Sequence, residues 1–282
     1  MLIGTAFAKI NRELRIGAVR PDGFHEILSR FASIDLSDRL TAEPWAEGVA
    51  FSCDDASLPQ DEGNLVVRAA RLLRAHLGAA AGARLRLEKG IPSGAGLGGG
   101  SSDAATALRL LCRLWEREPP PAKLSEIAAR LGSDVPFFLT GGEADVRGRG
   151  EIVVGRPDTP AVELTILVPS FAIATADVYA AHRREHQGRG VLPARLDIEG
   201  SGRFFGANDL AKAILAIRPE MGALLQAARA ASEEAAITGS GSAIVLLRPS
   251  DDAASSLAAA FPGSRIYRAR TLSRREYLAL QC

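Results

Sequence analysis

Glycine recurs at positions 94, 96 and 98–100, directly before Ser101, Ser102 and an alanine- and leucine-rich run. The preceding residues 83–92, ARLRLEKGIP, alternate apolar and charged side chains as a half-buried strand does. A strand, a glycine-rich turn and a helix start together form an anion site, because unpaired amide N–H groups and the positive end of the helix dipole face one point. This arrangement predicts a phosphate-binding loop.

Two common phosphate-binding templates fit the loop poorly. A Walker loop places a lysine directly before the serine or threonine at the helix start, and Gly100 occupies that position. The dinucleotide pattern G-x-G-x-x-G is matched by Gly94, Gly96 and Gly99. Its acidic residue belongs at the end of a second strand, whereas Glu116 stands at the end of a predicted helix, before three prolines. Neither template is favoured.

A lysine and an aspartate could supply charge stabilisation and proton transfer. Lys9 interrupts the apolar stretch AFAKIN, where an ammonium is costly unless another group pairs with it. Asp134 follows a loop glycine and precedes Val135 and Pro136, and it is the candidate acceptor of a substrate proton. Residue types alone leave two alternatives open, a snorkelling strand lysine and a helix-capping aspartate.

An aromatic residue and a histidine, Phe24 and His25, follow a turn made by Pro21, Asp22 and Gly23. A planar base requires an aromatic face and an edge-reading donor or acceptor, which this dipeptide supplies. Ordinary packing within a hairpin is the alternative interpretation.

The segment His182–His186, HRREH, matches H-x-x-E-H, a pattern in which two histidines four residues apart bind zinc in one class of peptidases. The segment is densely charged and offers no apolar helix that could hold a rigid metal site. A solvated helix end is therefore favoured over a hydrolase.

Periodicity and turn residues predict the elements that carry these groups. The first 45 residues are expected to be β-rich, with a turn near residues 20–26. Helices are expected over 64–78, 101–116, 123–132, 175–186, 207–230 and 251–261, and strands over 83–92, 162–168, 242–247 and 264–268. Residues 158–161 are the expected domain boundary.

Composition limits the class of protein. The 282 residues are 47% hydrophobic, which allows a substantial core, and 34 basic residues balance 33 acidic ones. No net field therefore draws the chain toward nucleic acid or an anionic membrane. Cys53, Cys112 and Cys282 are odd in number and far apart, as expected in a reducing compartment, with two thiols in the core and a loose C-terminal one. No signal peptide or long apolar run is evident, so we expect a cytoplasmic protein.

Residues 92–105, PSGAGLGGGSSDAA, resemble the phosphate-binding motif of the GHMP kinases, a superfamily of small-molecule kinases. The resemblance extends to other segments in family order from residue 6 to residue 247. These are AFAKINRELRIGAVRPDGFHEI, LGSDVPFFLTGGEADVRGRGE and ITGSGSAIVLL, with weaker matches at EGNLVVRAA and GANDLAKAILAIRPEM. The form GLGGGSSDAA is similar to that of one branch, which phosphorylates a cytidine-diphosphate-linked polyol in the non-mevalonate route to isoprenoid precursors.

The resemblance implies an α+β, two-domain GHMP-kinase fold. Residues 1–157 would form a domain like ribosomal protein S5 domain 2, and residues 158–282 a ferredoxin-like domain. It also implies ATP as phosphate donor, Mg²⁺ with unknown ligands, and a small-molecule acceptor carrying a cytidine diphosphate. The alternatives are a kinase of the same superfamily acting on homoserine, mevalonate or a sugar, and a non-catalytic nucleotide-binding module. Lys9 together with Asp134 argues against the module.

The resemblance also assigns the site residues. Lys9 and Asp134 are the implied catalytic pair, with the lysine beside the aspartate. The implied substrate-binding residues are Asn11, Phe24, His25 and Tyr179; Phe24 stands where the family usually has tyrosine, so it keeps the stacking face and lacks the hydroxyl. The implied ATP-binding residues are Asn64, Pro92, Ser93, Gly94, Ala95, Gly96, Leu97, Gly98, Gly99, Gly100, Ser101 and Ser102. Asn64 stands just before a predicted helix, so capping of that helix is the alternative to a nucleotide contact. Asp103 would repel phosphate if it faced the loop, so we expect it to point away. Residues 238–242, TGSGS, form a second glycine turn that either closes over the site or is a plain tight turn.

Overall fold

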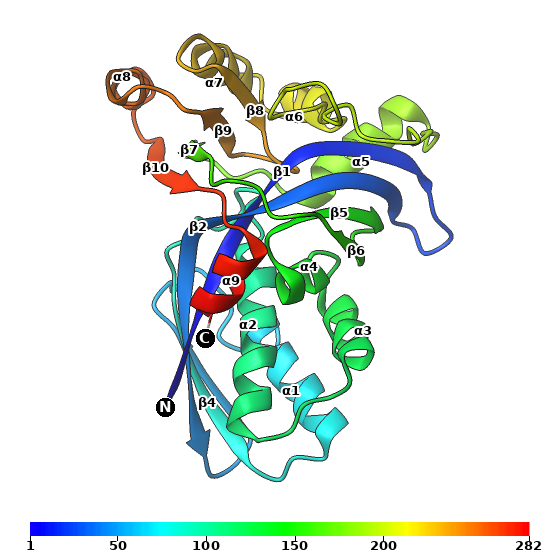
Figure 1. Cartoon of the computed structure of the whole chain (residues 1–282), viewed down its shortest axis with the longest axis vertical. Coiled ribbons are helices and arrows are strands. Elements are labelled where there is room, and N and C mark those ends of the chain that lie inside the picture. Colours follow the sequence, from blue (N-terminus) through cyan, green and yellow to red (C-terminus); the bar gives the residue numbers. More distant parts are fainter. Residues whose placement is uncertain (282) are drawn as a thin grey trace.

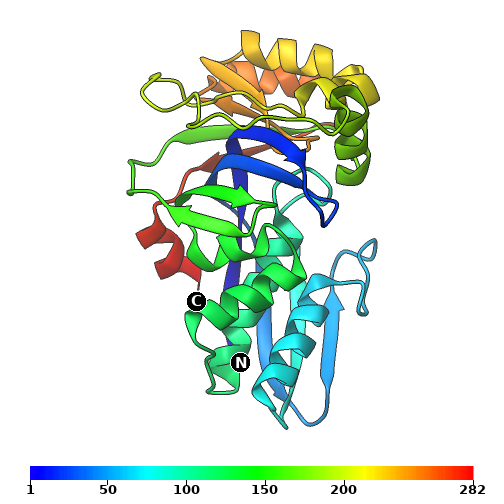
Figure 2. The same cartoon turned by 90° about the vertical axis from the view of Figure 1, so that its right-hand side faces the viewer.

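A computed structural model describes residues 1–281 and contains two β-sheets, one in each half of the chain (Figure 1). The strands of the first sheet are β1 (Leu2–Val19), β2 (His25–Trp45), β3 (Val49–Cys53), β4 (Gly82–Glu88), β5 (Glu143–Gly148) and β6 (Ile152–Gly155). Their order is β3-β4-β2-β5-β6, with β1 paired to β2. The accompanying helices are α1 (Leu65–Leu77), α2 (Gly99–Leu114), α3 (Pro121–Leu131) and α4 (Val135–Thr140). They lie together on one side of this sheet (Figure 2).

The long hairpin of β1 and β2 carries the first candidate residues. The two strands pair antiparallel from Leu2 opposite Ala42 to Val19 opposite His25, with three register shifts on the way. Residues 6–11 are all buried, because this part of β1 is covered on both faces. Strand alternation places Lys9 on one face, while its neighbours Ala8 and Ile10 face the core on the other.

The second sheet has a ferredoxin-like topology. Its strands are β7 (Glu163–Val168), β8 (Glu234–Ile237), β9 (Ile244–Leu247) and β10 (Arg265–Arg270), all antiparallel and in the order β10-β7-β9-β8. The helices are α5 (Thr175–His186), α6 (Ala211–Ile217), α7 (Glu220–Ala230) and α8 (Asp251–Ala260). With α5–α7 between the first two strands and α8 between the last two, the chain follows the β-α-β-β-α-β pattern.

The two sheets share a hydrophobic core. Ala8 and Ile10 of β1 and Ile34 of β2 pack in one cluster with Ile166 of β7 and Val245 of β9. Burial of this apolar surface fixes the two halves against each other. The relative position of the two sheets is therefore set by core packing.

A last helix, α9 (Arg274–Gln281), returns to the first half of the chain. Its Tyr277 is fully buried, donates a 2.7 Å hydrogen bond from its hydroxyl to the Phe138 carbonyl, and packs against the Phe7 ring at 5.5 Å. The first sheet ends at Gly155 and the second begins at Glu163, whereas α9 lies beside β1. The domain boundary at residues 157–158 stays a prediction.

Most predicted elements are confirmed, and the exceptions have local causes. Helix α1 begins at the predicted cap Asn64, whose Oδ1 accepts from the Val66 amide at 2.9 Å, and it ends at Gly78 in the left-handed region. The single helix predicted over 207–230 is wrong, because the chain breaks at Arg218 and Pro219 between α6 and α7. Strands β3, β5, β6 and β8 and helices α4 and α9 were not predicted.

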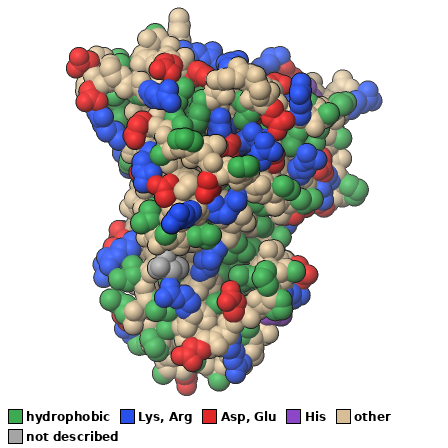
Figure 3. All heavy atoms as spheres, in the orientation of Figure 1, with side chains coloured by type: hydrophobic (Ala, Val, Ile, Leu, Met, Phe, Trp, Pro, Cys, Tyr) green, Lys and Arg blue, Asp and Glu red, His purple; other side chains and the backbone are tan. Residues whose placement is uncertain are grey.

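The cysteine and surface predictions have mixed outcomes. Cys112 is buried as predicted, whereas Cys53 is half-buried and packs against the edge of the core; Cys282 lies outside the described residues. Positive and negative side chains are intermixed over the face shown in Figure 3. Across residues 1–281, no helix combines the length and the apolar character needed to cross a membrane.

Candidate active site

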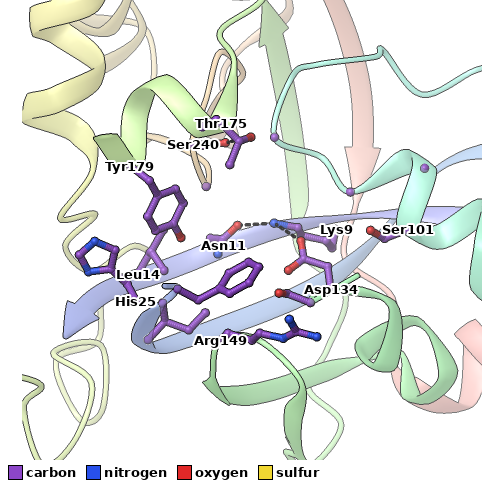
Figure 4. Close-up of a pocket in the computed structure, with 18 of the residues that line it drawn as sticks. Lys9, Asn11, Leu14, His25, Ser101, Asp134, Arg149, Thr175, Tyr179 and Ser240 are labelled. Atoms are coloured by element: carbon purple, nitrogen blue, oxygen red, sulfur yellow. Dashed lines mark hydrogen bonds and ion pairs between the residues drawn. The ribbon is translucent and has the colours of Figure 1, made fainter. Parts of the chain in front are cut away.

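A cavity of about 950 Å³ lies between the glycine-rich loop, β1, the start of α4 and α5 (Figure 4). Lys9 and Asp134 stand in its middle, with Ser101 on one side and Tyr179 and His25 on the other. The cavity therefore brings together residues from both halves of the chain.

The loop between β4 and α2 points its glycines and its larger side chains in opposite directions. Ala95 and Leu97 are buried in the core between the sheets. Gly94, Gly96 and Gly98 alternate with them, line the cavity and have φ angles of 69°, 79° and 74°. This left-handed conformation is open to glycine and strained for other residues. The apolar residues hold the loop down while the glycines present backbone to the cavity.

At two of these glycines, neighbouring atoms also leave no room for a side chain. A Cβ on Gly96 would lie 2.8 Å from the Thr238 carbonyl oxygen, and one on Gly98 would lie 2.8 Å from the Phe138 ring. Gly100 is different, because its Cβ would meet only a Leu65 methyl, at 3.8 Å, beside the open cavity. The first-turn amides of α2 lack intrahelical acceptors and are available to an anion there.

Lys9 and Asp134 form the central ion pair. The Lys9 Nζ lies 3.5 Å from Asp134 Oδ2, donates to Asn11 Oδ1 at 2.6 Å, and sits 4.5 Å from the centre of the Phe31 ring. The Lys9 side chain is 5% exposed and that of Asp134 is 30% exposed. Asp134 precedes α4 but makes no side-chain capping bond, so the helix-capping alternative is not supported. The carboxylate is oriented toward the lysine and the cavity.

Asn11 and the loop 238–242 fix the position of Lys9. Besides accepting from Lys9, Asn11 donates from Nδ2 to Ser29 Oγ at 3.0 Å, and its backbone amide donates to Thr238 Oγ1 at 2.7 Å. Gly239 and Ser240 of the same loop line the cavity. The second glycine turn is therefore a tight turn before β9 that also borders the site.

The other end of the cavity is aromatic. His25 is buried, with Nδ1 2.9 Å from the Gly17 carbonyl, and its ring lies 5.8 Å from that of the half-buried Tyr179. Because a carbonyl only accepts, Nδ1 carries the proton and Nε2 has a free lone pair in the neutral ring. This Nε2 has no hydrogen-bond partner among the described residues. Burial raises the pKa of the Tyr179 phenol, which keeps that group neutral.

Some predicted ATP-binding side chains point elsewhere. Ser102 is fully buried and donates from Oγ to the Phe7 carbonyl at 2.7 Å, so its hydroxyl does not face the cavity. Asn64 does not line the cavity, because its side chain caps α1 and donates to the Pro59 carbonyl. Pro92 and Ser93 border a smaller cavity of about 250 Å³ on the outer side of the loop.

A buried cluster of three charged side chains lies beside the start of the glycine-rich loop. Lys89, which follows β4, pairs with Asp38 of β2 and lies 2.9 Å from Asp103 Oδ2 in α2. Asp38 also accepts from the amides of Gly90 and Ile91 at 2.6 and 2.7 Å. Asp103 is thus directed away from the phosphate site, as predicted. Burial raises the pKa of Asp103. For Lys89, burial alone would lower the pKa, but the two neighbouring carboxylates have the larger effect and raise it.

Replacing Lys89 by Met is expected to lower the free energy of unfolding by about 3–5 kcal/mol, because two carboxylates would remain buried without their cation. Urea titration of the purified variant measures this change. Lys123→Met is the matched control, since Lys123 forms an exposed pair with Glu126 and should cost about 0–1 kcal/mol. A Lys89→Met protein as stable as the control would show that the cluster does not stabilise the fold.

Several cavity residues were missed from the sequence. Thr175 at the start of α5 and Ser240 share a 2.8 Å hydrogen bond across the cavity wall. Arg149, in the turn between β5 and β6, also lines the cavity, with its guanidinium carbon 4.8 Å from the centre of the Phe24 ring. Phe24 itself is 48% exposed. Arg149 and Ser240 belong to segments that resemble the family, and Ser240 is part of the predicted glycine turn 238–242, whereas Thr175 lies outside those segments.

The zinc-peptidase pattern has a different role in the fold. His182 and His186 stack on each other at 4.2 Å, and Glu185 pairs with Lys212. Burial lowers the pKa of His182, which lies edge-on to His25 at 5.8 Å. Within residues 1–281, no three His, Cys, Asp or Glu side chains converge as metal ligands. Here the two histidines pack behind the aromatic end of the cavity.

A glycine loop that faces a Lys–Asp pair, in a cavity between two sheets of which the second has a ferredoxin-like topology, is the arrangement expected of a small-molecule kinase of the GHMP class. The model of the GHMP kinases N terminal domain matches residues 64–142. A protein of Pelotomaculum thermopropionicum named 4-diphosphocytidyl-2-C-methyl-D-erythritol kinase is 44% identical, over 75% of this chain and 72% of its own length. This chain belongs to the family of 4-diphosphocytidyl-2-C-methyl-D-erythritol kinases.

Solved structures confirm the predicted fold. A crystal structure of 4-(cytidine 5'-diphospho)-2C-methyl-D-erythritol kinase superimposes with a TM-score of 0.79 at 36% identity, covering 96% of this chain and 99% of the other. Homoserine kinase from Cytophaga hutchinsonii matches with a TM-score of 0.67 at 20% identity, over 96% and 95% of the two chains, which shows the shared fold alone. The chain is therefore an enzyme of this kinase family, and the hydrolase alternative is set aside.

Proposed function

We propose that this kinase transfers the γ-phosphoryl group of ATP to the 2-hydroxyl of 4-diphosphocytidyl-2-C-methyl-D-erythritol, in the non-mevalonate route to isoprenoid precursors. The observation that carries the proposal is the Lys9–Asp134 pair, 3.5 Å apart, between a glycine-rich anion site and an aromatic end with an unpaired imidazole nitrogen. Phosphoryl transfer to an alcohol requires the nucleotide phosphates and the acceptor hydroxyl to meet at the reacting groups, and this cavity places the Lys–Asp pair between a site for each.

In the proposed reaction the substrate hydroxyl oxygen attacks the γ-phosphorus, the bond to the β-bridging oxygen breaks, and ADP leaves. Asp134 accepts the hydroxyl proton, while Lys9 holds the carboxylate in place and stabilises charge on the attacking oxygen. Asn11 keeps the ammonium at this point by accepting its hydrogen bond. No covalent phosphoenzyme is required.

The nucleotide end is assigned to the glycines that line the cavity. We propose that the amides of residues 98–101 receive the ATP phosphates, and that Ser101 Oγ is the protein oxygen that faces Mg²⁺ or phosphate. When bound, Mg²⁺ would neutralise part of the phosphate charge, and in kinases it takes many of its ligands from phosphate and water. Because the reaction consumes ATP, we propose a cytoplasmic location.

The acceptor end is assigned to the cytosine base. His25 Nε2 is an unpaired acceptor, and the exocyclic amino group of cytosine is a donor that uracil lacks. Tyr179 and the exposed face of Phe24 offer stacking surfaces for the ring. Sites with buried polar groups reject ligands that leave those groups unpaired, so this end should select cytidine compounds.

Substrate choice is tested by ATP turnover with the purified enzyme. We expect phosphorylation of 4-diphosphocytidyl-2-C-methyl-D-erythritol at a kcat/KM at least about 10⁴-fold above those for mevalonate and homoserine, which lack a base to occupy the aromatic end of the cavity. Comparable turnover of either small acid would overturn the proposed acceptor and leave the kinase assignment intact.

Replacing His25 by Ala is expected to weaken cytidine binding by about 10–100-fold, because the base amino group loses its acceptor, while ATP binding changes less than about threefold. Calorimetric titration with cytidine and, separately, with ATP measures both. The control is His76→Ala, an exposed histidine on α1 outside the cavity, which should leave both affinities unchanged. Equal losses for cytidine and ATP would argue for general disruption and against base recognition.

A further inference from the structure

The cavity carries an excess of positive charge on its acceptor side. Lys9 is balanced by Asp134, which is the only acidic residue among the described residues that line the cavity. The remaining charged lining residues are Arg149, Arg183 and Arg184. An anionic group is therefore expected on this side, separate from the triphosphate that the glycine loop would hold.

Among these arginines, Arg149 is the most firmly placed. It is half-buried, and its Nη2 donates to the Ala129 carbonyl of α3 at 2.6 Å. Its backbone amide donates to Glu151 Oε2 at 2.7 Å. Within residues 1–281 its guanidinium forms no ion pair, and it lines the cavity beside the Phe24 ring. Arg183 and Arg184, in contrast, are exposed residues on α5.

Arg149 also has a definite place along the cavity. Its turn packs against the catalytic loop, since a Cβ on Gly150 would lie 3.0 Å from the Cβ of Ser133, the neighbour of Asp134. On its other side its guanidinium carbon is 4.8 Å from the centre of the Phe24 ring. In Figure 4 its side chain extends beneath Asp134. The guanidinium thus lies beside the Phe24 ring and beneath Asp134.

We propose that Arg149 binds the diphosphate of the acceptor substrate and thereby sets the distance between the cytosine pocket and Asp134. The proposal rests on the proposed acceptor, in which a diphosphate links the base to the polyol. A guanidinium offers planar, paired donors that match phosphate oxygens, and one of its nitrogens is already held by Ala129. Arg149 is in this sense a specificity residue for the linked, anionic acceptor.

The test compares cytidine with cytidine diphosphate as ligands, by calorimetry with the nucleotide site filled by a non-hydrolysable ATP analogue. Wild-type enzyme should bind cytidine diphosphate more tightly than cytidine, and raising salt should reduce this preference. Arg149→Gln should weaken cytidine diphosphate about 10–100-fold and leave cytidine within about threefold. Arg149→Lys should restore part of the lost affinity for cytidine diphosphate, because lysine keeps the positive charge but lacks the paired donors of the guanidinium.

Arg147→Gln is the matched control, because Arg147 is exposed on β5, two residues before Arg149, and does not line the cavity. It should leave both affinities unchanged. If Arg149→Gln keeps the wild-type preference for the diphosphate, or instead weakens the ATP analogue, the role of Arg149 is overturned. If wild-type enzyme binds neither cytidine compound, the proposed acceptor itself fails, and that outcome is distinct from the first two.

Discussion

Asp134→Asn is expected to lower kcat by about 10²–10⁴-fold, the usual contribution of a general base, with little change in ATP affinity. The amide keeps the size of the side chain and its place at the start of α4, but it cannot accept the hydroxyl proton. Since the Asp134 side chain makes no capping bond, the fold should be unaffected. Steady-state kinetics, ATP titration and thermal unfolding of the same preparation separate these effects.

Lys9→Met should cause a loss of similar size, because the buried ammonium both orients Asp134 and faces the attacking oxygen. If the two side chains act as a unit, the double variant should be scarcely slower than the slower single variant. Multiplicative losses in the double variant would mean that they act independently.

Asp177→Asn is the control for the aspartate, since Asp177 is exposed in the first turn of α5 and does not line the cavity. It should retain turnover close to wild type. An Asp134→Asn enzyme that is equally active would remove this carboxylate from proton transfer.

Gly100→Val is expected to reduce ATP affinity by about 100-fold or more without lowering the melting temperature. The protein leaves this position open, with only a Leu65 methyl 3.8 Å from the Cβ position, and the added methyl groups would enter the space assigned to phosphate. In a helix, valine is if anything more favourable than glycine by a few tenths of a kcal/mol. Fluorescence or calorimetric titration with ATP, beside a thermal melt, measures both quantities.

Gly222→Val provides a matched comparison. Gly222 also lies in the first turn of a helix, α7, and its Cβ position meets only a Leu215 methyl at 3.9 Å. This variant should bind ATP normally. If Gly100→Val binds ATP as well as Gly222→Val does, the start of α2 does not hold phosphate.

The parts of the site that could be predicted are those formed by residues that lie close together in the sequence. The strand, the glycines and the start of α2 are contiguous, so the anion site follows from local geometry. The pairing of Lys9 with Asp134 joins distant segments, and only the resemblance to a family predicted it. Roles for the individual site residues stay predictions until the variants are measured.

The missed features depend on helix phase and tertiary contacts. Helix α2 begins at Gly99, two residues earlier than predicted, and each residue adds about 100° of rotation. Ser102 is therefore turned toward the Phe7 carbonyl of β1 and away from the cavity. Arg149 lies in a turn, where no periodic pattern reports on direction, and its importance follows from Phe24 and Ala129, which are remote in sequence.

Helix α9 is synthesised last but packs against the first sheet, so folding of the first half of the chain must wait for the end of synthesis. Tyr277 and the Phe138 carbonyl that it contacts are 139 residues apart, so at about 5–20 residues per second roughly 7–30 s separate their emergence from the ribosome. During that interval the Phe7 ring lacks its aromatic neighbour, and the half of the protein that carries Lys9 and Asp134 cannot complete its packing. A nascent chain stalled before residue 274 should accordingly be cleaved by protease within the first sheet, whereas one extended past residue 281 and clear of the exit tunnel should resist.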